Sequence, residues 1–150
     1  MSLDQDAVRH YAHVFEAITP ESLDELEVLL ADGVLFRDPF NTLHGKRDFM
    51  RVFEHMYETC TEPAFQIHDI GFGEHAAYLR WTMTAKLKSW PRTALHFEGM
   101  SEVMTDTEGH ISAHIDHWDS ASQLLACLPG IGWLIRRILK LFQLGPATEG

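Results

Sequence analysis

The spacing of apolar residues changes at Pro63, and this change restricts the chain to few folds. After Pro63, residues 65–71, 76–87, 93–105 and 110–119 alternate with the period of two that is typical of strands. Before it, apolar residues recur at helical spacing in three groups: Val8, Tyr11, Ala12, Phe15 and Ile18; Leu23, Leu26, Leu29 and Leu30; and Phe49, Phe53, Met56 and Cys60. Three helices followed by long strands predict an α+β domain, with helices covering one face of an antiparallel sheet.

Turn residues refine this division. Asp32-Gly33 ends the second predicted helix, and residues 34–37 form a short strand that stops at Asp38-Pro39. Beyond the last strand, residues 120–128 and 132–144 have helical patterns separated by Pro129-Gly130. We therefore predict a domain over residues 1–128, followed by a C-terminal amphipathic helix and tail over residues 129–150.

Composition narrows the class of protein. At 150 residues with 45% hydrophobic content, the chain is long enough to bury one core. A net charge of −10 argues against a nucleic-acid partner, which needs a basic face. Cys60 and Cys127 do not indicate a disulfide framework, and residues 1–6 lack the apolar core of a signal peptide. We expect a cytoplasmic protein.

Two motifs place a carboxylate among aromatic residues. One is the run Phe36-Arg37-Asp38-Pro39-Phe40 with His44-Gly45, and the other is the run from His114 to Asp119. Pro39 holds Asp38 out of helical geometry, and strand alternation puts Asp116 on one face with His114 and Trp118. A buried acid is costly unless it is paired or used, so both motifs predict a pocket.

With these motifs, and with Gly109-His110-Ile111 before the last strand, the order of elements resembles the nuclear transport factor 2-like superfamily over about residues 6–125. That group includes ketosteroid isomerases, limonene-epoxide hydrolases and SnoaL-like polyketide cyclases. The resemblance implies a cone-shaped, curved sheet around a pocket for a small apolar molecule, used without a cofactor. The same fold also serves proteins that catalyse nothing.

The resemblance to ketosteroid isomerases is partial. Asp38 matches their proton-shuttling base, whereas Val14 stands at the position of their oxyanion-binding tyrosine, with Tyr11 one turn away. Ser101 stands where their protonated aspartate would be. Because a base without its oxyanion hole loses much of its rate enhancement, steroid isomerisation is disfavoured.

Limonene-epoxide hydrolases match at other positions. Arg80 corresponds to their strand arginine and Asp116 to their last-strand aspartate, but Thr82 replaces the middle aspartate. Their water-positioning tyrosine and asparagine correspond to Phe36 and Asp38. SnoaL-like cyclases need only one acid/base residue in an apolar pocket, which Asp38 or Asp116 beside His114 satisfies.

Together these features predict a cofactor-independent acid/base enzyme that acts on a small apolar molecule. The expected catalytic residues are Asp38, Asp116, Arg80 and His114, and the expected substrate-binding residues are Phe36, Phe40, Tyr11, Val14, Phe97, Ser101, Thr82 and Trp118. The alternative is a non-catalytic ligand-binding or dimeric assembly module. In that case an Arg80–Asp116 ion pair joins two strands and Asp38 only shapes a turn.

We expect no metal site, although the chain has ten histidines. His114 and His117 point to opposite faces of a strand, so they cannot bind one ion without a bulge. His10 and His13 lie near the N-terminus, where exposure to solvent is the common outcome.

Two further patterns concern partners. Trp81 and Met83 face away from Arg80 and Thr82, and on an outer sheet face they would favour a homodimer. Residues 131–144 carry an apolar arc of seven residues opposite Arg136, Arg137 and Lys140. We expect this arc to dock on protein, with contact to a membrane surface as the second possibility.

Overall fold

The computed structural model describes residues 3–145, which divide into two compact units, residues 3–118 and residues 119–145. We describe each unit by itself. The first begins with helix α1 (Gln5–Glu16), whose N-cap Asp4 accepts a hydrogen bond from the backbone amide of Ala7 at 2.9 Å. Val8, Tyr11 and Phe15 form the buried face of α1, as their spacing predicts.

The second predicted helix is shorter than its pattern indicates. A 3-10 turn, η1 (Pro20–Ser22), leads into α2 (Leu23–Glu27), and strand β1 then spans Leu30–Arg37. The reason is tertiary pairing: Leu30 lies opposite Ile111, whose backbone amide donates to the Leu29 carbonyl at 2.9 Å. A short strand β2 (Thr42–His44), which the sequence pattern does not predict, pairs antiparallel with β1.

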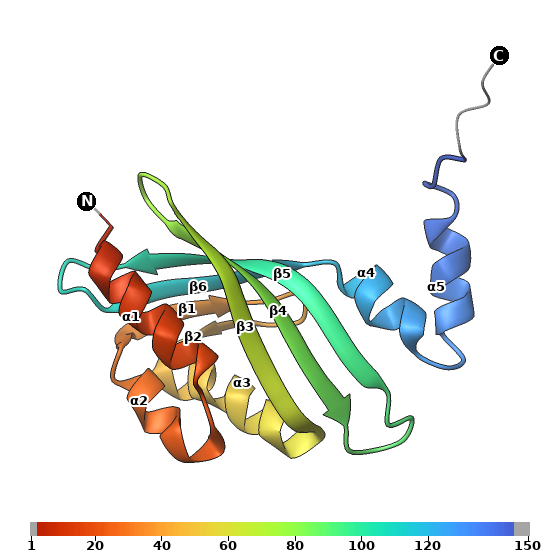
Figure 1. Ribbon diagram of the computed structural model, residues 1–150, viewed down its shortest axis with the longest axis horizontal. Coiled ribbons are helices and arrows are strands. Elements are labelled where there is room, and N and C mark those ends of the chain that lie inside the picture. The colour runs from red at the N-terminus through yellow and green to blue at the C-terminus, as the bar shows by residue number, and fades with distance from the viewer. Residues whose placement is uncertain (1–2, 146–150) are drawn as a thin grey trace. The chain divides into compact units, whose positions relative to one another are not determined.

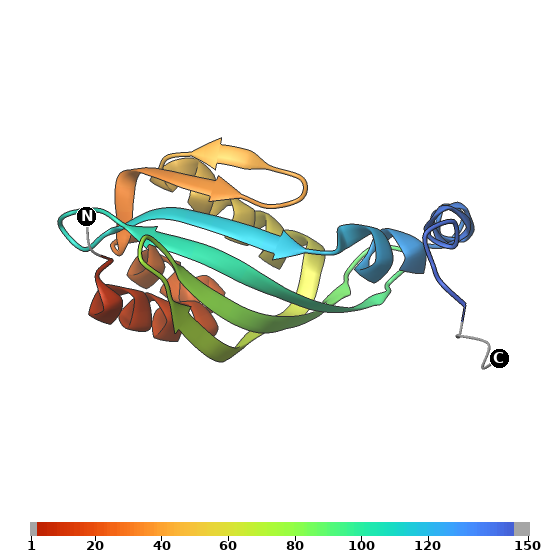
Figure 2. The same ribbon diagram turned by 90° about the horizontal axis from the view of Figure 1, so that it is seen from above.

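The described residues of this unit form one curved, six-stranded sheet. After α3 (Lys46–Thr59) come β3 (Cys60–Phe72), β4 (Ala77–Leu87), β5 (Ala94–Thr105) and β6 (Ile111–Trp118). The strand order is β2-β1-β6-β5-β4-β3, antiparallel except for the parallel pair of β1 and β6. The three N-terminal helices lie along one face of the sheet (Figure 1), and the strands twist progressively from β2 to β3 (Figure 2). The predicted α+β fold is confirmed.

The two faces of β4 are the reverse of what we expected. Trp81 and Met83 are buried on the face that the helices cover, whereas Arg80 is exposed on the outer face. The apolar alternation from Ala77 through Leu79 and Trp81 to Ala85 explains this, because burying the face with the larger apolar area stabilises the fold more. Neither Trp81 nor Met83 therefore supplies an apolar outer surface.

The second unit contains α4 (Ser120–Gln123), the 3-10 turn η2 (Leu125–Cys127) and α5 (Gly132–Leu139). Asp119 caps α4 by accepting from the amide of Ser122 at 3.0 Å, and Arg136 donates to the Ala126 carbonyl, which links α5 to η2. The division between the two compact units falls at residues 118/119, and the boundary predicted from the sequence lies ten residues later. Within residues 3–145, none of the helices combines the length and the apolar character that a membrane span requires.

Candidate active site

A chain of buried hydrogen bonds connects four elements inside the first unit. The Tyr11 hydroxyl on α1 lies 2.8 Å from His114 Nδ1 on β6. His114 Nε2 lies 2.8 Å from Asp116 Oδ1, and the same oxygen accepts from Ser101 Oγ at 2.5 Å. Ser101 in turn accepts from Trp81 Nε1 at 2.8 Å. Helix α1 and strands β4, β5 and β6 each contribute to this network.

The environment of His114 is almost entirely aromatic. The residue is 1% exposed, and its ring is stacked on Phe15 at 5.3 Å and on Phe36 at 5.7 Å between ring centroids. Phe49 and Tyr11 contact its edges, both at 5.8 Å. These side chains hold the imidazole in one orientation, so that its two nitrogens point at Tyr11 and Asp116.

Donor and acceptor chemistry assigns the protons of the network. Burial, and secondarily the negative charge of Asp116, raises the pKa of Tyr11 well above its ordinary value, so the hydroxyl keeps its proton. That proton is donated to His114 Nδ1, which must then be unprotonated, and His114 Nε2–H donates to the carboxylate of Asp116. A doubly protonated ring would leave the Tyr11 proton without an acceptor among the described residues, at a cost of about 1–3 kcal/mol. The arrangement therefore favours a neutral His114 beside an ionised Asp116.

Ser101 and Trp81 hold Asp116 from the other side. Trp81 Nε1 is a donor only, so Ser101 uses its lone pair for Trp81 and its proton for Asp116. The indole reaches Ser101 across Gly99, where an added Cβ would lie 2.7 Å from the Trp81 ring. A glycine at this point of β5 is thus required by the close approach of Trp81.

Asp116 keeps one oxygen uncommitted. Both of its hydrogen bonds reach Oδ1, and no described residue donates to Oδ2. Its side chain is 17% exposed, while Tyr11, Ser101 and His114 are at most 1% exposed. Asp116 is therefore the point at which the buried network meets solvent or a ligand.

Aromatic rings lie beside this carboxylate. Trp118, two residues further along β6 and on the same face, stacks on Phe97 at 4.5 Å between centroids and contacts Phe40 edge-on at 5.8 Å. Phe97 is buried, whereas Phe40 is 57% exposed. This cluster of Phe40, Phe97 and Trp118, which we call the aromatic rim, provides an apolar surface next to Asp116.

Asp38 stabilises the loop that follows β1. Its Oδ1 accepts from the amides of Phe40 at 2.8 Å and Asn41 at 2.6 Å, and the Asn41 side chain contacts both carboxylate oxygens at 3.1 and 3.3 Å. Asp38 follows directly on Arg37, which lies opposite Ile115, so the loop ends up at the same end of the sheet as Asp116. Asp38 thereby fixes the loop that carries Phe40.

Arg80 and Thr82 do not join the network. Arg80 is exposed on the outer face of β4, and the Thr82 hydroxyl lies 2.7 Å from Nε2 of the exposed His68. The expected ion pair of Arg80 with Asp116 inside the cone is wrong, because the strand turns Trp81 inward instead. Among the described residues, Asp116 is bonded to His114 and Ser101.

Two of the predicted substrate-binding residues belong to the core around His114. Phe36 is buried against His114, and Val14 is partly buried against the core. Sequence reasoning missed the inward Trp81 and the Phe15 and Phe49 rings around His114. The apolar alternation of β4 and the helical spacing of Phe15 and Phe49 were the signals that could have located them.

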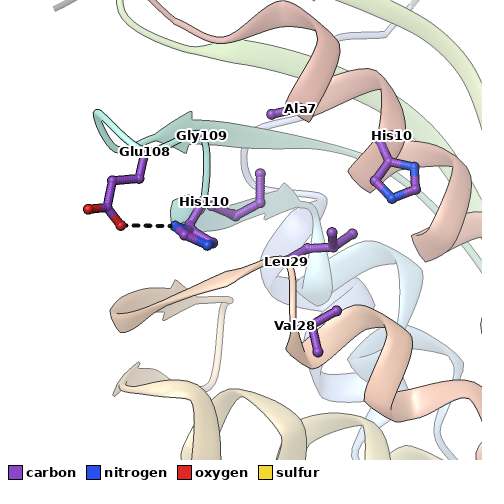
Figure 3. Close-up of a pocket in the computed structure, with 8 residues that line it drawn as sticks. Ala7, His10, Val28, Leu29, Glu108, Gly109 and His110 are labelled. Atoms are coloured by element: carbon purple, nitrogen blue, oxygen red, sulfur yellow. Dashed lines mark ion pairs between the residues drawn. The ribbon is translucent and has the colours of Figure 1, made fainter.

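A separate pocket of about 240 Å³ lies between α1, the end of α2 and the turn joining β5 to β6 (Figure 3). His10 enters it from α1, and His110 enters from the turn, where its Nδ1 lies 3.8 Å from Glu108. None of the predicted catalytic or substrate-binding residues lines this pocket. No group of three or more His, Cys, Asp or Glu in the described chain is arranged to hold a metal ion.

Fold and network together define a class: the α+β domains of the nuclear transport factor 2-like type, with a curved, unclosed sheet around a buried polar centre. Within that class, the model of the SnoaL-like domain matches residues 8–114, and the chain belongs to this family. The resemblance found in the sequence is thereby confirmed. The family includes cyclases, isomerases and epoxide hydrolases.

Solved structures agree on the fold. An NTF2-like protein of unknown function from Burkholderia pseudomallei is similar with a TM-score of 0.67 and 16% identity, over 81% of this chain and 95% of that one. A hypothetical protein with a ketosteroid isomerase-like fold from Catenulispora acidiphila gives 0.66 and 15%, over 80% and 90%. An LEH-like epoxide hydrolase from M. tuberculosis gives 0.62 and 18%, over 91% and 92%. No curated protein matches the chain significantly.

Proposed function

We propose that this protein is a cofactor-independent enzyme that removes a proton from carbon in a small apolar carbonyl compound, with Asp116 as the base. The observation that carries the proposal is the state of Asp116. His114 and Ser101 anchor its Oδ1, while Oδ2 has no partner among the described residues and the side chain is partly exposed. A held carboxylate with one free oxygen is suited to general-base catalysis.

The reaction balances with Asp116 alone. Oδ2 takes a proton from a carbon next to a carbonyl, and the C–H electron pair moves into an enolate whose charge rests on the carbonyl oxygen. Where a C=C bond is conjugated with this enolate, protonated Asp116 returns the proton to the far carbon of the resulting dienolate, and the double bond shifts, which isomerises the substrate. Alternatively the enolate carbon attacks a second carbonyl, and Asp116 protonates the new alkoxide, which closes a ring.

The donors of the network limit the substrate. Tyr11 donates to His114, Ser101 to Asp116 and Trp81 to Ser101, so none of these three is free to bind an enolate oxygen. A substrate served by this site must therefore have an acidic C–H bond, as at a carbon between two carbonyls. The aromatic rim favours an apolar or aromatic body for that substrate.

Epoxide hydrolysis is the less favoured member of the family's activities for this chain. The limonene-epoxide hydrolases that the sequence resembles use two carboxylates with an arginine between them. In this chain Arg80 is exposed on the outer sheet face, and Thr82, at the position of the middle carboxylate, contacts His68. The roles of the remaining candidates follow: His114 and Tyr11 position Asp116, and Asp38 positions the rim.

Deuterium uptake from heavy water into a panel of apolar aryl ketones and β-keto esters tests the proposal, with mass spectrometry as the readout. We expect uptake above the buffer rate for dicarbonyl compounds. Asp116→Asn should lower it by about 100-fold or more, the usual contribution of a general base. Arg80→Gln is the matched control and should leave uptake unchanged, because Arg80 lies outside the network.

Two results would contradict the proposal. One is equal uptake by the wild type and Asp116→Asn. The other is no enzyme-dependent uptake across the panel together with saturable binding of the same compounds, which would favour the non-catalytic ligand-binding module.

A further inference from the structure

The second unit carries a surface that the proposed chemistry does not use. In residues 131–144, large apolar side chains are exposed: Ile131 by 47%, Trp133 by 59%, Leu134 by 44%, Ile138 by 46%, Leu141 by 78%, Phe142 by 82% and Leu144 by 97%. Large apolar side chains exposed together in one segment indicate a contact surface.

Basic residues accompany this patch. Arg136, Arg137 and Lys140 are exposed, and Asp119 is the only acidic residue in residues 119–145. The first unit is the opposite: residues 1–118 hold 9 Lys and Arg against 20 Asp and Glu. Because this segment is cationic while the rest of the protein is acidic, it favours contact with an anionic partner.

The arrangement along the helix distinguishes a bilayer from a protein groove. Ile131, Leu134 and Ile138 share one side of α5, whereas Trp133, Arg137 and Lys140 follow one another at spacings of four and three on another side. An indole in one row with cationic side chains fits the headgroup level of a membrane. There the ring lies at the interface and the long basic side chains extend to lipid phosphates. A protein groove would instead cover the apolar side and leave Trp133 and Leu144 in water.

We propose that residues 131–144 bind the surface of an anionic lipid bilayer, with the apolar side chains inserted among the acyl chains and Arg137 and Lys140 at the phosphates. Helix α5 spans only Gly132–Leu139 and is too short to cross, so it lies along the interface. The sequence pattern favoured docking on protein, with contact to a membrane surface second. The row of Trp133, Arg137 and Lys140 is the observation that leads us to propose the membrane surface.

Co-sedimentation of the full chain with vesicles tests the proposal. Vesicles of phosphatidylcholine alone are compared with vesicles that also contain phosphatidylserine, at low and high salt. We expect binding only to the anionic vesicles, weakened by salt. Arg137→Glu/Lys140→Glu should lower partitioning by at least about tenfold, since each surface cation contributes about fivefold. Leu141→Ser/Phe142→Ser should also lower it by at least about tenfold, because it removes two exposed apolar side chains that would insert.

Matched controls keep the test specific. Arg47→Glu/Lys86→Glu reverses two exposed cations of the first unit, and Val28→Ser removes an apolar side chain that is 66% exposed. Both should bind anionic vesicles like the wild type, and far-ultraviolet circular dichroism should show all variants folded. Binding that survives both C-terminal double substitutions would overturn the proposal. So would a dimer that dissociates on these substitutions without any binding to vesicles, since that result assigns the segment to a second copy of the chain.

Discussion

At the scale of single residues, Tyr11 and Asp116 bind opposite nitrogens of the His114 ring, so each fixes the protonation state that the other meets. The phenol donates because it is protonated, and burial extends that state to higher pH, while the carboxylate receives Nε2–H because Nδ1 is occupied as an acceptor. Three side chains thus hold one another in a single arrangement of protons. The free oxygen of Asp116 is the part of that arrangement left for chemistry.

The raised pKa of Tyr11 predicts how stability depends on pH. Unfolded tyrosine ionises near pH 10, whereas buried Tyr11 keeps its proton to higher pH. Above about pH 10 the unfolded state therefore binds fewer protons, and the free energy of unfolding falls by up to about 1.4 kcal/mol per pH unit. Tyr11→Phe should flatten this decline, as urea unfolding at neutral and alkaline pH would measure.

Tyr78→Phe is the control for this experiment, because Tyr78 is 40% exposed. It should retain the wild-type slope. At neutral pH Tyr11→Phe should also destabilise the fold by about 1–3 kcal/mol, because His114 Nδ1 loses its donor in a buried site. Identical alkaline slopes for the wild type and Tyr11→Phe would show that the hydroxyl ionises as freely in the fold as in solution.

At the scale of elements, three strands meet where two indole rings cross β5. Gly99 lies opposite Trp81 on β4 and opposite Trp118 on β6. A Cβ there would approach the Trp81 ring to 2.7 Å and the Trp118 Cβ to 2.9 Å. One glycine therefore lets both the network and the aromatic rim form.

Gly99→Ala should displace Trp81 from Ser101 and destabilise the fold by about 1–3 kcal/mol, the usual cost of overpacking. Gly71→Ala on β3 is the matched control, since a Cβ at Gly71 meets no atom within 4 Å. Thermal unfolding and tryptophan fluorescence measure the two effects. A Gly99→Ala protein as stable as the control would mean that Trp81 can move without loss.

Most of these elements could be predicted from the sequence, but the face that β4 turns toward the core was predicted wrongly. The change of periodicity at Pro63 predicted the order of helices and strands except for β2, and alternation placed His114, Asp116 and Trp118 on one face. The match to a family motif predicts an interior Arg80, but the apolar alternation of β4 turns Trp81 inward instead. For β4, the apolar alternation of the sequence predicts which side chains are buried better than the resemblance to limonene-epoxide hydrolases does.

What sequence could not supply is non-local pairing. Residues 29–32 continue a helical pattern, yet Leu30 joins β1 because Ile111, far along the chain, pairs with it. Likewise nothing near Asp38 distinguishes a base from a turn residue until its hydrogen bonds to Phe40 and Asn41 are seen. The resemblance predicts Ser101 as a pocket residue, but its hydrogen bond to Asp116 depends on the register of β5 and β6.

At the scale of the whole molecule, the homodimer expected from the sequence stays a prediction, and its basis changes. The outer sheet face presents Tyr78 and Met100, which are 40% and 39% exposed, in place of Trp81 and Met83. If this face joins two copies, Tyr78→Asp should shift the protein to monomers in analytical ultracentrifugation. Val28→Asp, on an apolar residue outside the sheet, should leave the assembly unchanged. A wild-type protein that sediments as a monomer at every concentration would exclude the dimer.

The parallel pairing of β1 with β6 also sets the order in which the chain can fold. Tyr11 and His114 are 103 positions apart, and β1 obtains its neighbour β6 only after nearly the whole first unit has been made. Contacts of such long range require a large loop to close before they stabilise anything, so they slow folding. A chain emerging from the ribosome can build the hairpin of β3 and β4 early. A chain that ends before β6 lacks both His114 and Asp116, so it cannot contain the site.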